Sequence, residues 1–481
     1  MSVRPVHVNF VGGRWQPSVS GRTYAKRNPA RPSEIIGEFP QSAPVDVDQA
    51  VGSAAAAFGE WSRKPASQRA VILNEAATAI DARADLISRD MTAEMGKPLR
   101  ESRLEVARAA QIFRFYAGEA WRTVGELYEQ SANGSAVYTQ QRPLGVVGLI
   151  TPWNFPAAIP AWKSAPALIY GNTVVLKVAQ EAPLTGLHLA RCLQAGGIPA
   201  GVFNLVVGSG SDVGSHLVRH PLTRALSFTG SVAVGSLVRT EAAKQGKRIQ
   251  LELGGHNPLL VLPDADLDRA VEAAYAGAYW SAGQKCTATR RIYVHESLYA
   301  SFRSRLVERM QRGIVGDPND PQTEVGPMVN EAQMLEVLAA IERGQDEGAS
   351  LLAGGHRLDG EGYWVAPTLF EEVSDDAFLS CEEVFGPVVS LYSFAALDEA
   401  IHRANAVPFG LSASIFTRDA ASIHKFVAEL QAGMLHVNQQ TAGADVHVPF
   451  GGVKASGYGP HEQGRAAREF YTESITVYAD V

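Results

Sequence analysis

Cys286 lies in a segment whose residue types favour covalent chemistry. The segment runs Trp280-Ser-Ala-Gly-Gln-Lys-Cys286 and continues with Thr-Ala-Thr, so no bulky hydrophobic side chain flanks the thiol. A cysteine kept for core packing more often lies inside an apolar run. A thiolate is a strong nucleophile, but a lone cysteine is more often a buried filler than a catalyst. The partners that thiol chemistry needs decide between these two interpretations.

Asn154 and Glu252 are the candidate partners of such a thiol. Asn154 stands in the turn Thr151-Pro-Trp-Asn-Phe-Pro156 after an apolar run, where α/β sheets place ligands, and its amide could donate to an oxyanion. Glu252 stands in Leu251-Glu-Leu-Gly-Gly255, where a carboxylate is costly unless it is paired or functional. It is therefore a candidate general base. An ordinary turn and a half-buried salt bridge remain the alternatives.

Two glycine-rich turns are candidates for binding phosphate. Gly208-Ser-Gly-Ser-Asp-Val-Gly214 is close to a dinucleotide fingerprint, but Val213 stands where Gly-x-Gly-x-x-Gly needs glycine. Phe228-Thr-Gly-Ser-Val-Ala-Val-Gly235 ends a predicted strand and opens a predicted helix. Gly230 would let the main chain approach a phosphate, which Ser231 and the helix N-terminus would face. A plain strand-to-helix turn remains possible on this segment alone.

Alternating strands and helices are expected to position these segments. Near-continuous apolar strands separated by helical stretches predict a parallel sheet covered on both faces. The runs are Val146–Ile150, Thr173–Lys177, Phe203–Val207, Ala225–Phe228 and Arg248–Leu253. Helices precede them, the first with Asp46 as its expected N-cap, and a second α/β domain follows Asn257. Two strands, 135–142 and 474–478, have no obvious local partner.

The composition excludes several classes of protein. The net charge is −7 without a basic arm, which disfavours a nucleic-acid partner. Three well-separated cysteines fit a reducing compartment, and no apolar run reaches membrane-spanning length. The twelve histidines form no metal-binding pattern, so no metal is expected. We expect a soluble, cytoplasmic protein that binds neither nucleic acid nor membrane.

Six motifs resemble, in order and spacing, those of the aldehyde dehydrogenase superfamily, and the resemblance covers essentially the whole chain. The motifs are Pro152-Trp-Asn-Phe-Pro156, Phe228-Thr-Gly-Ser231, Leu251-Glu-Leu-Gly-Gly255, Gly283-Gln-Lys-Cys286, Glu382-Glu-Val-Phe-Gly-Pro387 and Pro449-Phe-Gly-Gly452. The resemblance implies an α/β fold with a Rossmann-like cofactor domain, an α/β catalytic domain and a small β oligomerisation arm. The expected boundaries are 1–134 and 146–253 for the NAD(P)-binding domain, 254–450 for the catalytic domain, 135–145 and 471–481 for the arm, and 451–470 returning to the cofactor domain.

The resemblance also implies a reaction. An aldehyde is oxidised to a carboxylic acid through a thiohemiacetal and a thioester, and NAD or NADP is reduced. Cys286 is the implied nucleophile, Glu252 the base, and Asn154 with the N–H of Cys286 the oxyanion hole. Retention of Glu252 favours hydrolysis over acyl transfer to coenzyme A. The implied cofactor-binding residues are Trp153, Lys177, Gln180, Gly210, Gly230, Ser231, Gly235, Leu253, Gln333, Glu383 and Phe385. A homodimer or homotetramer is implied, with each arm strand adding to a neighbour's sheet.

Two positions depart from the family pattern. Lys177-Val-Ala-Gln180 ends in glutamine where many relatives carry the glutamate that binds the adenosine ribose. A carboxylate would repel a 2′-phosphate and neutral Gln180 would not, so we predict that NADP is accepted beside NAD. The preference between the two cofactors stays open. His256 replaces a common lysine, and no role is assigned to it.

Further segments resemble one subgroup, the bacterial α-ketoglutarate semialdehyde (2,5-dioxovalerate) dehydrogenases. The segments are Gly283–Thr289, Val437–Gly443 with His447–Gly452, and Gly459–Gly464. A semialdehyde acid needs a cation for its carboxylate, and Lys285 and Arg290 are the candidates. The rival is an aromatic or medium-chain aldehyde held by Phe155 and Trp162. A non-redox thiol esterase and a catalytically silent binding protein are the remaining alternatives.

Overall fold

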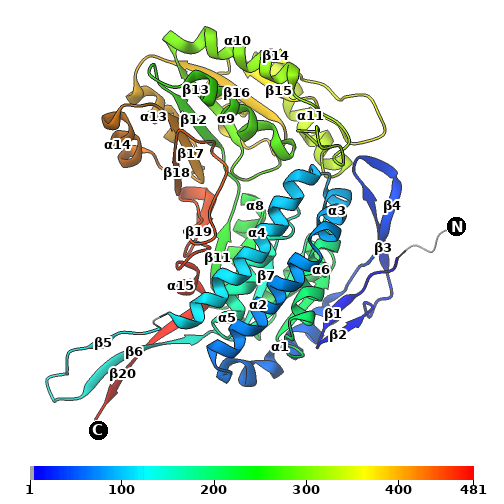
Figure 1. Cartoon of the computed structure of the whole chain (residues 1–481), viewed down its shortest axis with the longest axis vertical. Coiled ribbons are helices and arrows are strands. Elements are labelled where there is room, and N and C mark those ends of the chain that lie inside the picture. Colours follow the sequence, from blue (N-terminus) through cyan, green and yellow to red (C-terminus); the bar gives the residue numbers. More distant parts are fainter. Residues whose placement is uncertain (1–4, 123, 481) are drawn as a thin grey trace.

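The computed structural model describes residues 5–122 and 124–480, which form two α/β lobes and a slender arm (Figure 1). An eight-stranded sheet with the order β19-β11-β10-β7-β8-β9-β1-β2 organises the first lobe. Its five central strands are parallel, as predicted: β7 (Val146–Ile150), β8 (Thr173–Val178), β9 (Phe203–Val207), β10 (Thr223–Thr229) and β11 (Arg248–Glu252). Antiparallel edge strands complete it: β1 (Asn9–Val11), β2 (Arg14–Gln16) and β19 (Gly457–Tyr458).

Helices cover both faces of this sheet, and every residue of β7, β8 and β9 is buried. One face carries α5 (Ala158–Ile169) and α6 (Pro183–Ala195), with α2 (Ala66–Ala82), α3 (Ala84–Met95) and α4 (Leu99–Gly118) outside them. The other face carries α1 (Pro44–Arg63), α7 (Ser215–Arg219) and α8 (Val232–Ala243). None of the described helices is both long and apolar enough to cross a bilayer.

The N-terminus of α1 differs from the prediction. The helix begins at Pro44 with Ala43 as its N-cap, so Asp46 is not the cap but lies in the first turn. Its carboxylate accepts the N–H of Ala43 at 2.8 Å and that of Val19 at 2.9 Å. Proline is favoured at the first helical position because its fixed φ suits a helix and it has no N–H to leave unpaired. Asp46 therefore accepts hydrogen bonds from N–H groups near the start of α1 although it lies within the helix itself.

A seven-stranded sheet with the order β14-β15-β16-β13-β12-β17-β18 forms the second lobe around its own apolar core. All its neighbouring strands are parallel except β14 and β15. The strands are β12 (Asn257–Val261), β13 (Thr289–His295), β14 (Ser350–Ala353), β15 (Thr368–Glu371), β16 (Val388–Phe394), β17 (Ser412–Phe416) and β18 (Met434–Val437). The helices are α9 (Leu267–Tyr279), α10 (Glu296–Arg312), α11 (Glu331–Asp346), α12 (Phe378–Cys381), α13 (Leu397–Asn405) and α14 (Ala420–Glu429).

The arm joins the two strands for which no local partner was found. β6 (Ala136–Pro143) pairs antiparallel with β20 (Thr472–Ala479) over their whole length, and β5 (Leu127–Tyr128) pairs with the other edge of β6. Sequence patterns did not reveal this pairing because the partners are distant: Gln141 and Thr472 are 331 residues apart. Figure 1 shows the arm projecting from the body after the short helix α15 (Ala467–Tyr471).

Several short strands also escaped prediction. β14, β15, β18 and β19 span four residues or fewer, which is too short for a clear alternation of apolar and polar residues. The hairpin of β3 (Thr23–Asn28) and β4 (Arg31–Pro40) is longer, but its exposed, charged residues and two register shifts obscure the pattern. These strands are recognisable only from their pairing.

Candidate active site

The ends of parallel strands bring Asn154 and Cys286 to a common cleft. Asn154 lies in the turn after β7, and Cys286 lies in the turn between α9 and β13 of the other lobe. Both line a cavity of about 610 Å³ between the lobes. Glu252 is the last residue of β11, and its carboxylate is close enough to Cys286 to raise the pKa of the thiol. Asn154 and Cys286 therefore line the same cleft, and Glu252, which lines neither cavity, lies behind Leu253 of its wall and acts on the thiol through its charge.

The turn before Cys286 has an unusual backbone. Ser281, Ala282 and Gly283 adopt left-handed φ values of 57°, 53° and 66° in succession. This conformation costs about 1–2 kcal/mol for each non-glycine residue, so neighbouring groups must hold it. Glu101 of α4 does so, because its carboxylate accepts the N–H of Ser281 at 3.2 Å and the hydroxyl at 2.5 Å. The cysteine turn is thus anchored to α4.

Asn154 is fixed from two sides. Its amide Nδ2 donates to the main-chain oxygen of Gln284 at 3.1 Å, which places the amide beside the cysteine turn. Its own main-chain oxygen accepts from Lys97 Nζ at 2.8 Å. Its Oδ1 is buried without a hydrogen-bond partner among the described residues. The donor end of the amide therefore points toward the segment that carries the nucleophile.

Lys97 and Glu105 form a buried ion pair behind Asn154, with 2.5 Å between Nζ and Oε2. Glu105 Oε1 also accepts the N–H groups of Ala157 at 2.8 Å and Ala158 at 3.1 Å, at the start of α5. The pair therefore holds both ends of the Asn154 turn. Sequence reasoning missed it: Gly96 and Pro98 marked only a helix end, and the lysine between them carried no other signal.

The surroundings of Cys286 disfavour its thiolate form. Burial raises its pKa well above the ordinary range, and the carboxylates of Glu252 and Glu383 raise it further. Main-chain N–H groups of Thr287 and Cys286 act in the opposite direction. A base must therefore take the thiol proton before Cys286 can attack a carbonyl.

Glu252 lies near a network of buried charged and polar side chains that the sequence did not reveal. Burial and then the charge of Glu462 raise the pKa of Glu252 well above its ordinary value, while Lys163 lowers it. Lys163 forms an ion pair with Glu462 and donates to Ser227 Oγ at 2.7 Å. Trp162 Nε1 donates to the other Glu462 oxygen at 2.7 Å. Glu462 falls within the Gly459–Gly464 motif, but that motif suggested a subgroup and no role.

A second cavity extends the cleft along the large sheet. It measures about 280 Å³ and shares Pro152, Thr229, Gly230 and Ser231 with the first, so the two are continuous. It lies at the carboxyl ends of β7, β8 and β10, on the side of α8. Open α/β sheets bind dinucleotides at this position.

The residues of the second cavity fit a dinucleotide. Ser231 caps α8, accepting the N–H of Val234 at 3.4 Å, so the N-terminus of this helix faces the cavity. A Cβ at Gly235 would come within 2.5 Å of Leu253, so glycine allows the helix to pack closely there. Lys177 is buried in the wall of the cavity, where its ammonium could bind hydroxyl or phosphate oxygens, and burial lowers its pKa.

Most of the predicted cofactor residues line one cavity or the other. They are Trp153, Lys177, Gly210, Gly230, Ser231, Leu253, Gln333, Glu383 and Phe385. Gly235 packs behind Leu253, and Gln180 does not line either cavity. The main-chain oxygen of Gln180 accepts the Tyr24 hydroxyl at 3.0 Å. Sequence reasoning missed other lining residues, among them Thr229, Arg219 and Glu241.

None of the four predicted substrate residues lines the cleft. Trp162 is bonded to Glu462, and the ring of Phe155 faces Lys97 Nζ at 3.9 Å. Lys285 Nζ donates to the main-chain oxygen of Ala276 at 3.0 Å, and burial lowers its pKa to about 8. Arg290 donates to main-chain oxygens only. The cation roles of Lys285 and Arg290 remain predictions.

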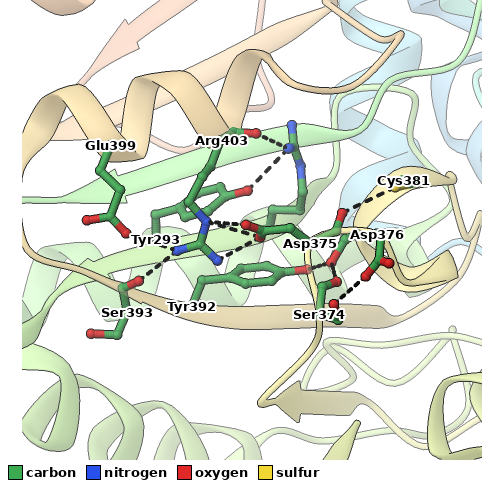
Figure 2. A network of polar contacts seen from close by, with 11 residues as sticks. Tyr293, Ser374, Asp375, Asp376, Cys381, Tyr392, Ser393, Glu399 and Arg403 are labelled. Carbon is green, nitrogen blue, oxygen red and sulfur yellow. Dashed lines mark hydrogen bonds and ion pairs between the residues drawn. The ribbon is translucent and has the colours of Figure 1, made fainter. Parts of the chain in front are cut away.

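A polar network around Arg403 and Asp375 holds the segment that precedes Glu383 in the chain (Figure 2). Arg403 of α13 donates to both oxygens of Asp375 and to the main-chain oxygen of Ser393. Ser380 and Tyr392 are joined through their hydroxyls at 2.7 Å. Glu383 itself accepts the N–H of Gly255 at 3.2 Å, and burial raises its pKa to about 7. The network fixes the chain that leads into Glu383.

The chain resembles known proteins over nearly its whole length. The model of the aldehyde dehydrogenase family matches residues 15–477. An alpha-ketoglutaric semialdehyde dehydrogenase of Bacillus subtilis is 42% identical over 98% of both chains. An alpha-ketoglutarate semialdehyde dehydrogenase of Haloferax volcanii is 44% identical, also over 98% of both. The crystal structure of an NAD-dependent aldehyde dehydrogenase from Sinorhizobium meliloti superposes with a TM-score of 0.97, at 34% identity over 99% of this chain and 95% of that one.

Proposed function

This chain belongs to the aldehyde dehydrogenase family, and from that premise we propose that Cys286, Asn154 and Glu252 are its nucleophile, oxyanion donor and base. It is an NAD(P)-dependent enzyme that oxidises aldehydes. The observation that supports the residue assignment is that Asn154 and Cys286 line one cleft, continuous with a cavity that fits a dinucleotide, while the charge of Glu252 acts on the Cys286 thiol.

The first half of the reaction forms a carbon–sulfur bond. Glu252 is the nearest candidate to take the Cys286 proton, since its own raised pKa brings it closer to that of a thiol. The sulfur then adds to the aldehyde carbon. Asn154 Nδ2 and the N–H of Cys286 donate to the alkoxide, and loss of one such donor costs about 3–4 kcal/mol of barrier. NAD(P), which residues of the second cavity such as Lys177 and Ser231 would hold, would supply the acceptor for the hydride expelled as the C=O bond re-forms.

The second half hydrolyses the thioester on Cys286. Once Glu252 has released the thiol proton to solvent, it takes a proton from water, the hydroxide adds to the thioester carbon, and the sulfur leaves as a thiolate. Lys163 and Glu462 lie behind Glu252 and keep a partner charge near it as it gains and loses its proton. Cys286 then regains a proton, and the carboxylic acid departs. The cycle consumes one water and returns the thiol unchanged.

The proposed substrate is a five-carbon semialdehyde acid with an α-keto group, α-ketoglutarate semialdehyde. The two relatives above, at 42% and 44% identity, carry names for that activity. The test is absorbance of reduced nicotinamide with a panel of this semialdehyde acid, hexanal and benzaldehyde, each with NAD and NADP. We expect kcat/KM for the semialdehyde acid to exceed the others by at least about 100-fold, since a desolvated carboxylate contact distinguishes them. Equal kcat/KM values for the three aldehydes would contradict the proposal that the semialdehyde acid is the preferred substrate.

The proposed assembly is a homodimer or homotetramer built through the arm. Apolar side chains of the arm and its base are strongly exposed: Trp121 at 78%, Leu127 at 80% and Tyr478 at 69%. Contiguous exposed apolar surface of this kind usually marks an interface, and β5 and β20 leave open sheet edges. Light scattering after size-exclusion chromatography tests it: a Leu127→Glu variant should lose its oligomer, and a wild-type monomer would remove the proposal.

The proposed domain division follows the sequence boundaries. In this proposal residues 1–134 and 146–253, with 451–470 returning to it, form the NAD(P)-binding domain, 254–450 the catalytic domain, and 135–145 with 471–481 the arm. The outermost predicted limits, residues 1 and 481, lie outside the described residues. A cytoplasmic location is part of the same proposal. It is supported by the three free cysteines, which suit a reducing compartment.

A further inference from the structure

Arg290, predicted above as a substrate contact, is instead held between two main-chain oxygens. It is only 2% exposed, at the start of β13. Its Nη2 donates to Gly283 O and its Nη1 to Gly386 O, both at 2.5 Å. Its Nε is buried without a hydrogen-bond partner among the described residues, and no described carboxylate forms an ion pair with it. A fully buried cation thus lies in the site without a carboxylate in contact to neutralise it.

The two carbonyls belong to the two loops that form the inner end of the cleft. Gly283 is the third left-handed residue of the cysteine turn. Gly386 follows Phe385 in the segment that, with Glu383, lines the cleft. The loops touch directly, because a Cβ on Gly283 would come within 2.2 Å of Gly386 O. Arg290 is therefore a cross-link between the nucleophile's turn and the loop on the cofactor side.

The charge of Arg290 acts on both loops. Burial lowers the pKa of Arg290 to about 10, while Glu383 and then Cys286 raise it. By reciprocity, the guanidinium favours the ionised forms of those two side chains. The charged groups that interact electrostatically with Cys286 are Glu252, Glu383, Lys285 and Arg290. The two carboxylates oppose the thiolate. Lys285, with a pKa of about 8, loses charge in the range where Arg290 keeps it.

We propose that Arg290 is a positioning residue: its guanidinium fixes the cysteine turn against the loop of Glu383 and Phe385, and its buried charge stabilises the Cys286 thiolate. The proposal rests on the proposed role of Cys286 as nucleophile. It adds a coupling, because a shift of the cofactor-side loop moves Arg290 and with it the cation that the sulfur faces. The turn and the loop are parts of one unit.

Two variants of similar size separate charge from shape. Arg290→Lys keeps a positive charge but reaches only one carbonyl, and Arg290→Gln keeps an N–H donor without charge. The readout is the rate of Cys286 alkylation by iodoacetamide between pH 6 and 10, measured by mass spectrometry of the Cys286 peptide in protein without added cofactor. We expect alkylation below its pH midpoint to be about tenfold slower in Arg290→Gln, which corresponds to a midpoint about one pH unit higher. Arg290→Lys should keep the wild-type midpoint.

The same pair tests the cross-link. Both variants lose one bridging bond, so both should raise KM for NAD several-fold while kcat falls less. Arg291→Gln is the matched control: its guanidinium donates instead to His256 O and Ala404 O, and it should leave the alkylation profile unchanged. Equal alkylation midpoints in Arg290→Gln, Arg290→Lys and wild type would overturn the charge role. An unchanged KM for NAD in both would overturn the cross-link.

The outcome is distinguishable from failure of the proposed function. Alkylation needs neither aldehyde nor turnover, so it reports on the thiol alone. If Cys286 were not the nucleophile, a Cys286→Ala enzyme would keep its dehydrogenase activity whatever the alkylation profiles showed. If Arg290→Gln does not fold, the Arg290→Lys profile decides, because a midpoint shift in that charge-retaining variant contradicts the proposal.

Discussion

The two sides of Cys286 are built in opposite ways. Toward the cofactor, strand ends and turns leave a cleft of about 610 Å³. Away from it lies α4, none of whose residues lines the cleft. Its acids Glu101 and Glu105 accept main-chain N–H groups of the cysteine turn and of Ala157, just after the Asn154 turn. On the open side, contacts with the cofactor provide binding free energy. On the packed side, contacts within the protein hold the reacting groups in place before any ligand binds. Affinity and chemical rate should therefore respond to different substitutions.

Cys286, where the two sides meet, should give the largest effect. Cys286→Ala removes the nucleophile, so we expect dehydrogenase activity to fall by at least about 10⁴-fold. The cleft remains, so NAD should still quench tryptophan fluorescence with a dissociation constant close to that of wild type. Lost NAD binding in a folded variant would show that the two sides are not separate.

Asn154 comes next, because it belongs to the packed side but acts on the reacting oxygen. Asn154→Ala should lower kcat by about 10²–10³-fold, the usual cost of one oxyanion donor. KM for NAD should change by less than about threefold, since the lost contact forms only as the alkoxide develops. Steady-state kinetics at saturating NAD give both numbers, and a rise in KM with unchanged kcat would place Asn154 in binding instead.

Glu252 separates the two halves of the reaction. In Glu252→Gln we expect steady turnover to fall about 100-fold, with slow hydrolysis limiting, while a burst of reduced cofactor near one per site persists at high pH. In the wild type, the hydrolysis rate should rise with pH through the folded-state pKa of Glu252, because only the ionised form accepts a proton from water. That pKa lies above its unfolded value, so ionising Glu252 also costs folding stability over the same rise in pH. Stopped-flow absorbance measures the burst, and a rate flat from pH 5 to 9 contradicts the assignment.

Substitution of Lys97 tests whether the packed side determines kcat by holding Asn154 in position. Lys97→Met leaves Glu105 buried without its cation, which costs about 3–5 kcal/mol of unfolding free energy. We expect kcat to fall about tenfold as the Asn154 turn loosens, and urea denaturation to show the lost stability. The double variant Lys97→Met, Glu105→Gln should recover part of both. The cleft-side control Ser231→Ala, a lost helix cap, should cost only about 1 kcal/mol and raise KM for NAD.

Gln180 gives the smallest expected effect and concerns only the outer cleft. Gln180→Glu adds a carboxylate near the adenosine end, so kcat/KM with NADP should fall about tenfold while the value with NAD changes by less than twofold. Paired assays with both cofactors measure the ratio. An unchanged ratio would mean that Gln180, whose main chain is tied to Tyr24, lies too far from the ribose to discriminate.

Short-range sequence patterns predicted the elements whose structure depends on neighbouring residues in the chain. The central strands from β7 to β11 were predictable because buried parallel strands are continuously apolar, and the Ser231 turn because strand, glycine and N-cap follow one another. The motifs supplied Cys286, Asn154 and Glu252, which the fold then brought together.

Long-range contacts escaped prediction for a physical reason. Lys97 meets Asn154 across 57 residues and Arg290 meets Gly386 across 96, and nothing near either residue records its partner. The same holds for Glu462, which reaches Lys163 across 299 residues. The sequence carries these side chains, but only the topology determines which groups they neutralise or hold.

The pairing of β6 with β20 has a consequence for the order of biosynthesis. β20 (Thr472–Ala479) follows its partner β6 (Ala136–Pro143) after the strands of both lobes, so the arm cannot close until the ribosome has made all of the chain between them. The edge strand β19 of the large sheet is also translated late, against strands that begin at residue 9. Contacts of such high sequence separation form slowly. The arm therefore closes only after the catalytic turn and the strands of both lobes have been synthesised.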